Sequence, residues 1–468
     1  MKQPNVPTIF IIFGITGHLA KTRLIPALYH LYAQGVLPRN FSIIGFSRRP
    51  FDRAAFQKLI RSYIAHVPAS PTVTSFVKLC SYHQGQFHDR QSYHALAAKL
   101  GYIDKEWRAC ASKLYYLAAP PKNYATLFTN LAHSGLTTNC STEEGWTRVL
   151  VEKPFGSDVR TAEKLESLLS RSFKEEQIFR VDHYLAKETV QNILTFRFSN
   201  SIFEPIWNSQ HIEKVHIRAL EKDDVGSRGA FYDEIGALRD FGQSHLLQML
   251  ALIAMENPRN LQADAIRRER ATVLNALQPR MLRSIESIAT RGQYHGYTTS
   301  KGVAKNSQTE TYFMVKAQLR SKRWRGVPFY LESGKGLSET MSDIAVYFKE
   351  SPCFCQGPHA DHKHRNVIHF HIKPHEGIAI RFWAKMPKLK GDIEPRELSF
   401  DYRDTPARTS EGYEKLLYDA INGDQTLFPS THEVAASWRF IEPILKAWKK
   451  VPLVKYKKGT MPILNKEL

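Results

Sequence analysis

The chain opens with a short apolar run that leads directly into a glycine turn and then into a helical pattern. Residues 8–13 read Thr-Ile-Phe-Ile-Ile-Phe, and Gly14-Ile-Thr-Gly17 follows them. The run lacks the basic start and the small-residue cleavage site of a signal peptide, and it is too short to span a membrane. We therefore expect a buried strand that turns into a helix, as at the start of a doubly wound sheet.

This strand–helix alternation continues to about residue 170, and a different pattern follows it. The next expected buried strands are 42–45, 114–117 and 149–151, and the expected helices are 19–32, 53–64, 124–132 and 158–169. Beyond residue 200, strand-like runs alternate apolar and polar residues, which is typical of an antiparallel sheet with one covered face. These runs are 213–219, 312–317, 343–348, 367–372 and 377–382, with helices expected at 237–255 and 433–448.

A chain of 468 residues is too long for one simple core, so two large domains are expected. We predict an α/β Rossmann-type dinucleotide domain at residues 1–181. A larger α+β domain with a broad antiparallel sheet follows at residues 182–468. No apolar stretch is long enough to span a bilayer, so we expect no membrane partner.

The turn after the first strand is a variant of the dinucleotide-binding fingerprint. Gly14 permits the tight turn, and Gly17 lets the backbone approach a pyrophosphate. Thr16 stands where the second glycine usually lies, and Ala20 occupies the third position. The candidate cofactor-binding residues of this segment are Gly14, Thr16, Gly17 and Lys21.

The end of the second expected strand selects the cofactor. An NAD enzyme normally places an acidic residue there to bind the ribose 2′-hydroxyl, but this chain has Gly45-Phe-Ser-Arg48-Arg49. Arginine can pair with a 2′-phosphate and stack on adenine, so we predict NADP and assign Arg48 to it. The alternative is that the two arginines are only solvated surface residues.

Residues 179–192 place an aspartate, a histidine, a tyrosine and a lysine where a strand runs into a helical pattern. At helical spacing, Lys187 lies one turn beyond His183 and Tyr184, so the three can bind one phosphate dianion. Asp182 can orient a histidine from elsewhere in the chain. The alternative is a simple strand-to-helix turn that Asp182 caps.

This segment resembles the active-site signature of glucose-6-phosphate dehydrogenases, Arg-Ile-Asp-His-Tyr-Leu-Gly-Lys-Glu. The likeness continues in order along nearly the whole chain. Its further parts are 196–203, 205–208, 230–240, 245–250, 325–330, 334–335, 413–419 and 423–428.

The resemblance implies an oxidoreductase that oxidises glucose 6-phosphate at C1 to the 6-phosphogluconolactone with NADP, the first step of the pentose phosphate pathway. It gives His245 the role of the base and Asp182 the role of orienting it. Lys153, in Glu-Lys-Pro-Phe-Gly, would contact both nicotinamide and sugar, with a cis Lys153–Pro154 bond. From the residues alone, His245 on an apolar helix could equally be a packed core histidine.

The resemblance also implies the substrate contacts. His183, Tyr184 and Lys187 would bind the phosphate, while Glu221, Asp240 and Lys335 would bind the sugar. Two departures stand out: His18 replaces the usual aspartate of the first turn, and Thr340 replaces a usual Arg or Lys. These departures keep open a related NAD(P)-dependent sugar dehydrogenase of altered specificity. The net charge of +20 keeps open a second alternative, a catalytically silent nucleotide-binding homologue.

The net charge of +20 is the unusual bulk property. The basic residues are scattered, which favours small anions such as sugar phosphates and dinucleotides over a nucleic-acid groove. We therefore expect a small-molecule substrate and no nucleic-acid partner. The resemblance implies a homodimer or a dimer of dimers across the large sheet.

The five cysteines are few and odd in number, which predicts reduced thiols and a cytoplasmic location. Several cysteines and histidines crowd into one short stretch, but their spacing fits no standard zinc motif. This group consists of Cys353, Cys355, His359, His362, His364, His369 and His371. We predict no metal there.

Overall fold

The computed structural model describes residues 6–139, 144–277, 288–352, 363–387, 393–404 and 412–462. The chain forms two compact units. The first contains residues 1–156, 160–186 and 410–431, and the second contains 157–159, 187–409 and 432–468. The chain thus leaves the first unit near residue 186 and returns to it at residues 410–431. A single boundary after residue 181 does not describe this return.

The first unit is built on a six-stranded parallel sheet in the order β3-β2-β1-β4-β5-β6. Its strands are β1 (Thr8–Phe13), β2 (Phe41–Ser47), β3 (Cys80–Gln84), β4 (Ser112–Leu117), β5 (Thr147–Val151) and β6 (Ile178–Arg180). The expected buried strands are all present, and every residue of β1 and β4 is buried because helices cover both sheet faces. This confirms the Rossmann-type expectation.

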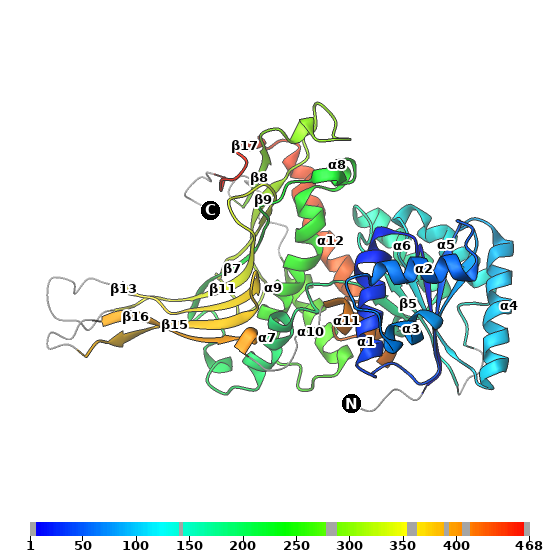
Figure 1. Ribbon diagram of the computed structural model, residues 1–468. Coiled ribbons are helices and arrows are strands. Elements are labelled where there is room, and N and C mark those ends of the chain that lie inside the picture. Colours follow the sequence, from blue (N-terminus) through cyan, green and yellow to red (C-terminus); the bar gives the residue numbers. More distant parts are fainter. Residues whose placement is uncertain are drawn as a thin grey trace. The chain divides into compact units, whose positions relative to one another are not determined.

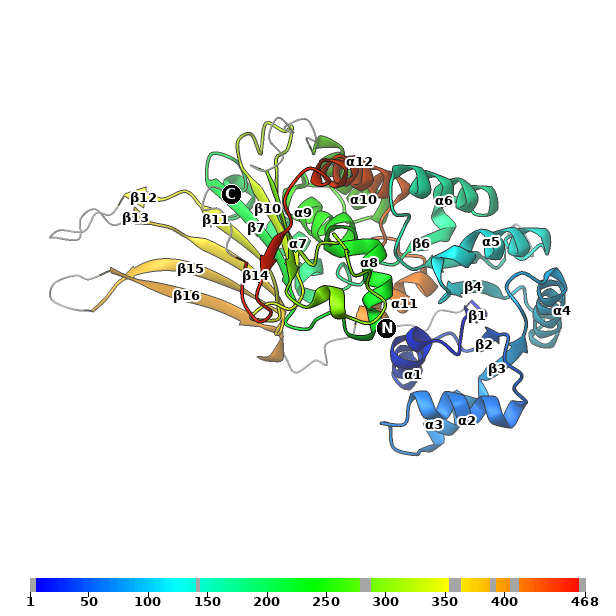
Figure 2. The ribbon, with the colours of Figure 1, turned by 90° about the horizontal axis from the view of Figure 1, so that it is seen from above.

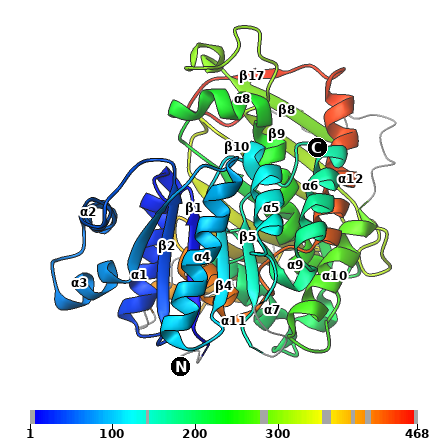
Figure 3. The ribbon, with the colours of Figure 1, turned by 90° about the vertical axis from the view of Figure 1, so that its right-hand side faces the viewer.

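Helices lie on both faces of this sheet. They are α1 (Ile25–Ala33), α2 (Arg53–Tyr63), α3 (Pro71–Lys78), α4 (Arg90–Trp107), α5 (Tyr124–His133), α6 (Val159–Ser172) and α11 (Gly412–Asn422). Figures 2 and 3 show α4, α5 and α6 on one side of the sheet and α1 on the other, and α11 contacts α1. Helix α11 therefore completes a layer of the first unit from a distant part of the chain.

The second unit contains a nine-stranded sheet in the order β16-β15-β14-β11-β7-β10-β9-β8-β17 (Figure 1). Its strands are β7 (Ile212–Leu220), β8 (Ala289–Tyr294), β9 (Tyr312–Ala317), β10 (Phe329–Gly334), β11 (Met341–Phe348), β14 (Val367–Lys373), β15 (Gly377–Lys385), β16 (Ile393–Asp401) and β17 (Val454–Tyr456). The pairs β7–β10 and β8–β17 are parallel and the others are antiparallel. The expected broad antiparallel sheet is therefore confirmed, with these two exceptions.

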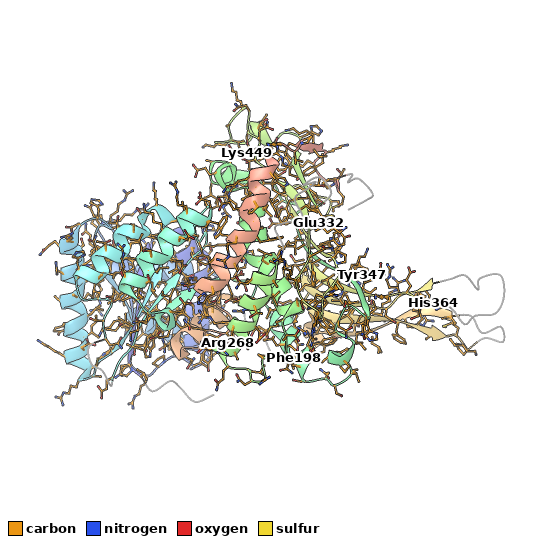
Figure 4. All side chains as sticks on the ribbon, turned by 180° about the vertical axis from the view of Figure 1, so that it is seen from behind. Phe198, Arg268, Glu332, Tyr347, His364 and Lys449 are labelled. Atoms are coloured by element: carbon orange, nitrogen blue, oxygen red, sulfur yellow. The ribbon has the colours of Figure 1, made fainter. Side chains whose placement is uncertain are left out.

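The two faces of the nine-stranded sheet differ in chemistry. On one face Ile217, Ile344 and Phe370 are fully buried, and helix α7 contacts β14 there. The other face is polar: Arg218 forms an ion pair with Asp343 at 2.6 Å, and His216 Nε2 lies 2.9 Å from a carboxylate oxygen of Glu332. Figure 4 labels Glu332 and Tyr347 on this sheet. The alternating sequence pattern therefore reflects one covered face and one polar face.

The helices of the second unit are α7 (Glu188–Phe198), α8 (Gly229–Ala237), α9 (Leu247–Ala254), α10 (Ala263–Ala276) and α12 (Thr431–Trp448). A π-helix, η6, occupies Leu238–Leu246 between α8 and α9 and contacts β7 and β10. The single helix predicted at 237–255 is thus a π-helical segment followed by an α-helix. A short hairpin pairs β12 (Ser351–Pro352) with β13 (Lys363–His364).

Two findings bear on the environment of the protein. Among the described residues, no helix is both long and apolar enough to cross a membrane. Cys80 is a free buried thiol, but Cys110 is disulfide-bonded. The expectation of reduced thiols is therefore wrong at Cys110, because an odd and sparse cysteine count does not exclude one bridge. The cytoplasmic location stays a prediction.

Candidate active site

A cavity of about 550 Å³ lies in the first unit, where the strands of the parallel sheet end. Ligands of open α/β sheets bind at this edge. Four predicted cofactor residues line the cavity, namely Gly14, Thr16, Gly17 and Arg48. Lys21 is not among the lining residues, and its N–H donates to the carbonyl oxygen of Gly17 at 3.2 Å.

The turn after β1 can be built only with glycine at its start. Gly14 has φ +90°, and a Cβ there would lie 2.4 Å from the carbonyl oxygen of Ala118 on the neighbouring strand end. The Thr16 hydroxyl lies 3.2 Å from the Ser47 hydroxyl, which ties the turn to the end of β2. The turn therefore lets a ligand approach the backbone closely, as a pyrophosphate requires.

The end of β2 presents cations and no carboxylate to the cavity. Arg48 and Arg49 both line it and are exposed. The backbone beneath them is fixed, because Tyr82 Oη donates to the carbonyl oxygen of Ser47 at 2.7 Å. These residues fit the 2′-phosphate of NADP better than the bare 2′-hydroxyl of NAD.

Lys153 follows β5 and lies next to the half-buried carboxylate of Glu152. The Lys153–Pro154 bond is cis, as the resemblance implies. Glu152 accepts hydrogen bonds from Tyr116 Oη at 2.5 Å and from Tyr413 Oη at 3.1 Å. Burial raises the pKa of Glu152, although the tyrosine hydroxyls and Lys153 partly oppose this effect. The main chain that carries Lys153 is therefore held by hydrogen bonds that extend to helix α11.

The predicted helical spacing of the phosphate-binding residues is wrong. Helix α7 begins at Glu188, with Lys187 as its N-cap, and residues 183–186 form a turn. The Asp182 carboxylate accepts the N–H of Tyr184 at 3.0 Å, which is the local bond that aspartate makes in turns. This short polar side chain ends the strand pattern before a helix can start, as the alternative of a strand-to-helix turn expects.

His183 and Tyr184 differ in environment. The His183 ring is half-buried and lies nearly parallel to the Tyr413 ring, with centroids 6.4 Å apart. Tyr184 is only 2% exposed, and Asp182 is fully buried. Tyr413 thus contacts both Glu152 and His183, so one side chain of α11 links the Lys153 segment to the Asp182 segment.

Lys187 forms an ion pair with Glu376, a residue from a distant part of the chain. Its ammonium lies 3.2 Å from the Glu376 carboxylate, which also accepts the N–H of Thr189 at 3.0 Å. Glu376 therefore caps the N-terminus of α7 and fixes the lysine at once. Neither role could be read from the sequence, because almost 190 residues separate Glu376 from Lys187.

In the second unit, the structure brings together the other predicted substrate residues. Lys335 forms an ion pair with Glu221, and its ammonium lies 5.9 Å from the centre of the Phe241 ring. Phe241 meets the His245 ring edge-on at 5.4 Å. Asp240 precedes Phe241 in the same π-helix. Glu221, Lys335 and His245 are therefore linked through Phe241. Asp240 belongs to the same cluster through the buried Tyr232. Burial raises the pKa of Tyr232, and the charges of Asp240 and Glu221 raise it further. The Tyr232 ring centre lies 5.5 Å from the Lys335 ammonium.

His245 is fully buried and lies near the end of η6. The π-helical hydrogen bonds of η6 give its side chains an angular spacing that an α-helix would not, and such segments are frequent at functional sites. Asp182 belongs to the first unit and His245 to the second, so their pairing stays a prediction.

Thr340, one of the two departures, has a structural role. Its hydroxyl accepts the N–H of Lys222 at 3.0 Å, next to Glu221. His18, the other departure, is exposed and follows Gly17. The main-chain N–H of Lys222 therefore has an acceptor, but position 340 carries no cation.

The proposed absence of a metal site stays a prediction. Cys353, Cys355, His359 and His362 lie outside the described residues. Of the described histidines, His369 and His371 stack with ring centres 5.4 Å apart. No group of three or more possible metal ligands occurs within the part of the chain that the structure describes.

Comparisons with known proteins cover both units. A family model described as "Glucose-6-phosphate dehydrogenase, NAD binding domain" matches residues 11–192, and one described as "Glucose-6-phosphate dehydrogenase, C-terminal domain" matches residues 194–465. The chain is 37% identical over 471 residues to a glucose-6-phosphate 1-dehydrogenase of Chlamydia muridarum, covering 95% of this chain and 91% of the relative. It is 38% identical over 458 residues to that of Aggregatibacter actinomycetemcomitans, with shares of 95% and 91%.

Solved structures give the same result. A glucose-6-phosphate dehydrogenase in complex with its substrate glucose-6-phosphate matches with a TM-score of 0.88 and 30% identity, over 99% of this chain and 96% of the other. The glucose-6-phosphate 1-dehydrogenase of Mycobacterium avium matches with a TM-score of 0.83 and 32% identity, over 98% and 96%.

Proposed function

Because this chain belongs to the glucose-6-phosphate dehydrogenase family, we propose that it oxidises D-glucose 6-phosphate at C1 to 6-phospho-D-glucono-1,5-lactone with NADP. The observation that carries the proposal is the full-length match to a solved relative that holds glucose 6-phosphate. The cavity with Gly14 and Arg48, and the cluster around His245, supply the parts that this reaction needs.

We assign cofactor binding to Gly14, Thr16, Gly17 and Arg48, with Lys21 just behind the turn. When bound, NADP supplies the acceptor for the hydride that leaves C1. The glycine turn admits the pyrophosphate, and Arg48 pairs with the 2′-phosphate. Lys153, on the main chain that Glu152 anchors, contacts nicotinamide and sugar.

One set of substrate residues binds the phosphate and another set binds the sugar. His183, Tyr184 and Lys187 bind the phosphate, and Glu376 keeps Lys187 at the start of α7. Glu221 and Asp240 accept hydrogen bonds from sugar hydroxyls, and Lys335 binds the substrate beside Glu221.

His245 removes the proton of the C1 hydroxyl as the hydride departs, and Asp182 stabilises the imidazolium that forms. Neutral imidazole suits this role near pH 7, because the unperturbed pKa of histidine is about 6.5. The negative charge of a carboxylate favours the charged ring, as in other histidine–aspartate pairs.

A second candidate is a related sugar dehydrogenase of altered specificity, which Thr340 favours. The hydroxyl that binds the N–H of Lys222 cannot provide the charge of an Arg or Lys. Weaker binding of glucose 6-phosphate would then let another sugar compete.

The first test measures the absorbance of reduced nicotinamide with purified protein and glucose 6-phosphate, and with either NADP or NAD. Free glucose and other sugar phosphates are run in parallel. We expect turnover with glucose 6-phosphate and NADP, and a loss of about 10²- to 10⁴-fold in kcat on His245→Ala. His94→Ala, an exposed histidine of α4, is the control and should keep full activity.

Each other outcome separates the alternatives. Turnover only with a sugar other than glucose 6-phosphate would change the assigned substrate and leave the cofactor assignment unchanged. Binding of NADP without turnover of any sugar would contradict the enzyme assignment and favour a silent homologue.

We also propose that the protein is a homodimer that uses the large sheet. Strand β16 is at one edge of the nine-stranded sheet, and two of its large apolar residues, Leu398 and Phe400, are 62% and 45% exposed. With Phe196, Ile378 and Ile380 they line a cavity of about 410 Å³. Exposed apolar edges of this kind favour association.

A further inference from the structure

The segment that carries Asp240 and His245 begins at a sharp break in the chain. Gly236 has φ +76° and ψ 169°, which lies outside the helical region, and η6 starts two residues later at Leu238. The first N–H groups of a helix have no partner within it, so another part of the chain must satisfy them. The structure shows which residue does so.

Glu310, just before β9, satisfies two successive N–H groups at this break. Its carbonyl oxygen accepts the N–H of Ala237 at 3.1 Å, and its carboxylate accepts the N–H of Leu238 at 3.0 Å. Glu310 is only 5% exposed. A carboxylate at a helix N-terminus also interacts favourably with the helix dipole.

The absence of a side chain at residue 236 makes room for this carboxylate. A Cβ on Gly236 would lie 2.5 Å from Glu310 Oε1 and 2.8 Å from its Cδ. Glycine also relieves the strain of the positive φ. Gly236 and Glu310 therefore fit one another, and neither can be changed freely.

The charge of Glu310 is only partly offset within the second unit. Burial raises the pKa of Glu310, and this is the largest effect on it. The hydrogen bond from Leu238 and the cations Arg239 and Arg291 oppose that effect. The cap therefore requires an acceptor oxygen held in place, whether or not it carries a full charge.

The start of η6 sets the direction in which its side chains point. In a π-helix each N–H bonds five residues back, as the N–H of Leu247 does to the carbonyl of Gly242. A slip to the four-residue spacing of an α-helix would rotate His245 relative to Asp240 around the axis. Capping of the first N–H groups by one buried residue opposes such a slip.

We propose that Glu310 is a positioning residue that fixes η6, and through it Asp240 and His245, for the oxidation of the sugar. This inference rests on the proposed function. It assigns Glu310 no contact with substrate or cofactor. Its effect is on the geometry of the base, so it acts on turnover rather than on NADP binding.

The test compares Glu310→Ala with Glu310→Gln. The amide keeps an acceptor oxygen at nearly the same place, whereas alanine leaves the N–H of Leu238 without an acceptor. We expect Glu310→Ala to lower kcat about 10- to 100-fold, because small displacements of reacting groups cost this much. The KM for NADP should change less than about two-fold, and Glu310→Gln should restore kcat to within about three-fold of wild type.

A control separates positioning from loss of stability. Ser70 caps α3 in the first unit by accepting the N–H of Val73 at 3.2 Å. Ser70→Ala should lower the melting temperature without lowering kcat. If Glu310→Ala keeps full kcat, or if Glu310→Gln is as inactive as Glu310→Ala, the positioning role is contradicted.

A second variant tests the same contact if Glu310→Ala does not fold. Gly236→Ala pushes on the carboxylate from the other side and should lower kcat in the same way, with an unchanged KM for NADP. Full kcat in this variant would also overturn the inference. Wild-type turnover is measured first, so a failure of the proposed function shows there and not in the variants.

Discussion

Arg48 is the side chain on which cofactor choice depends most directly. It lines the dinucleotide cavity at the end of β2, where no carboxylate is present to bind a 2′-hydroxyl. We expect Arg48→Ala to raise the KM for NADP about 10- to 100-fold and to leave the KM for NAD nearly unchanged, because a charge-assisted contact is lost. Steady-state kinetics with both cofactors measures this.

Arg39 provides the matched control for Arg48. It is an exposed arginine that precedes β2, at the opposite end of the same strand. Arg39→Ala should leave both KM values unchanged. An equal loss of NADP preference in the two variants would mean that net charge, rather than a contact of Arg48, selects the cofactor.

Thr340 allows a gain of function. Thr340→Arg places a cation beside Glu221 and Lys335, at the cost of the hydrogen bond to the N–H of Lys222. We expect the KM for glucose 6-phosphate to fall about ten-fold. A hydrogen bond to a charged group contributes about 1.5–3 kcal/mol, the lost hydrogen bond costs about 1 kcal/mol, and about 1.4 kcal/mol corresponds to ten-fold. Thr340→Val removes the hydrogen bond without adding charge and should not lower the KM. A lower KM in both variants would contradict the argument.

At the scale of single elements, helix α11 contains a carboxyl group whose charged form is disfavoured by burial. Its Asp419 is nearly buried and lies 2.5 Å from Lys415, yet burial raises the pKa of Asp419 to about 6. The folded protein therefore holds a proton that the unfolded chain releases near pH 4. The contribution of this group to stability falls as the pH rises from about 4 to about 6.

Asp419→Asn should remove that dependence. We expect the variant to match wild type near pH 4 and to be more stable above pH 6, by at most about 3 kcal/mol. Urea unfolding at pH 4.5, 6 and 8 measures the difference. Glu163→Gln, an exposed acid of α6, should show no such gain. A variant that is less stable than wild type at pH 8 would show that the Lys415 pair outweighs the burial.

The elements differ in how far the sequence predicts them. Strands such as β1 and β9 follow from apolar runs or alternation, because burial alone determines them. Strand β16 was not predicted, since most of its residues are exposed and polar. The π-helical hydrogen bonds of Leu238–Leu246 were not predicted either, because they depend on Gly236 and Glu310, which are far apart in sequence.

The site shows the same division. Gly14 and Arg48 were predicted from local patterns, and both line the cavity. The assignment of His245 needed the family resemblance, because an apolar helix with one histidine looks like core packing. Glu376 and Tyr413 contribute through contacts with distant residues, so only the structure reveals them.

At the scale of the whole molecule, self-association is the property to test. Leu398→Asp combined with Phe400→Asp places charges on the exposed apolar part of β16. We expect light scattering to show a dimer for wild type and a monomer for this variant, because buried unpaired charges oppose association. Tyr102→Asp, which alters a side chain of α4 that is 69% exposed, is the control. A dimer that persists in the β16 variant would place the interface elsewhere.

The return of residues 412–431 to the first unit has a consequence for the order in which the protein can mature during its synthesis. Gln425 Nε2 donates a hydrogen bond to the carbonyl oxygen of Ile178 at 2.9 Å, and the buried Arg180 donates one to the Thr431 hydroxyl at 2.6 Å. About 250 residues must leave the ribosome between these partners, which takes roughly 12 to 50 s at 5–20 residues per second. For that time the nascent parallel sheet lacks α11, and a buried guanidinium lacks one of its acceptors. The cofactor domain, although encoded first, is therefore completed almost last.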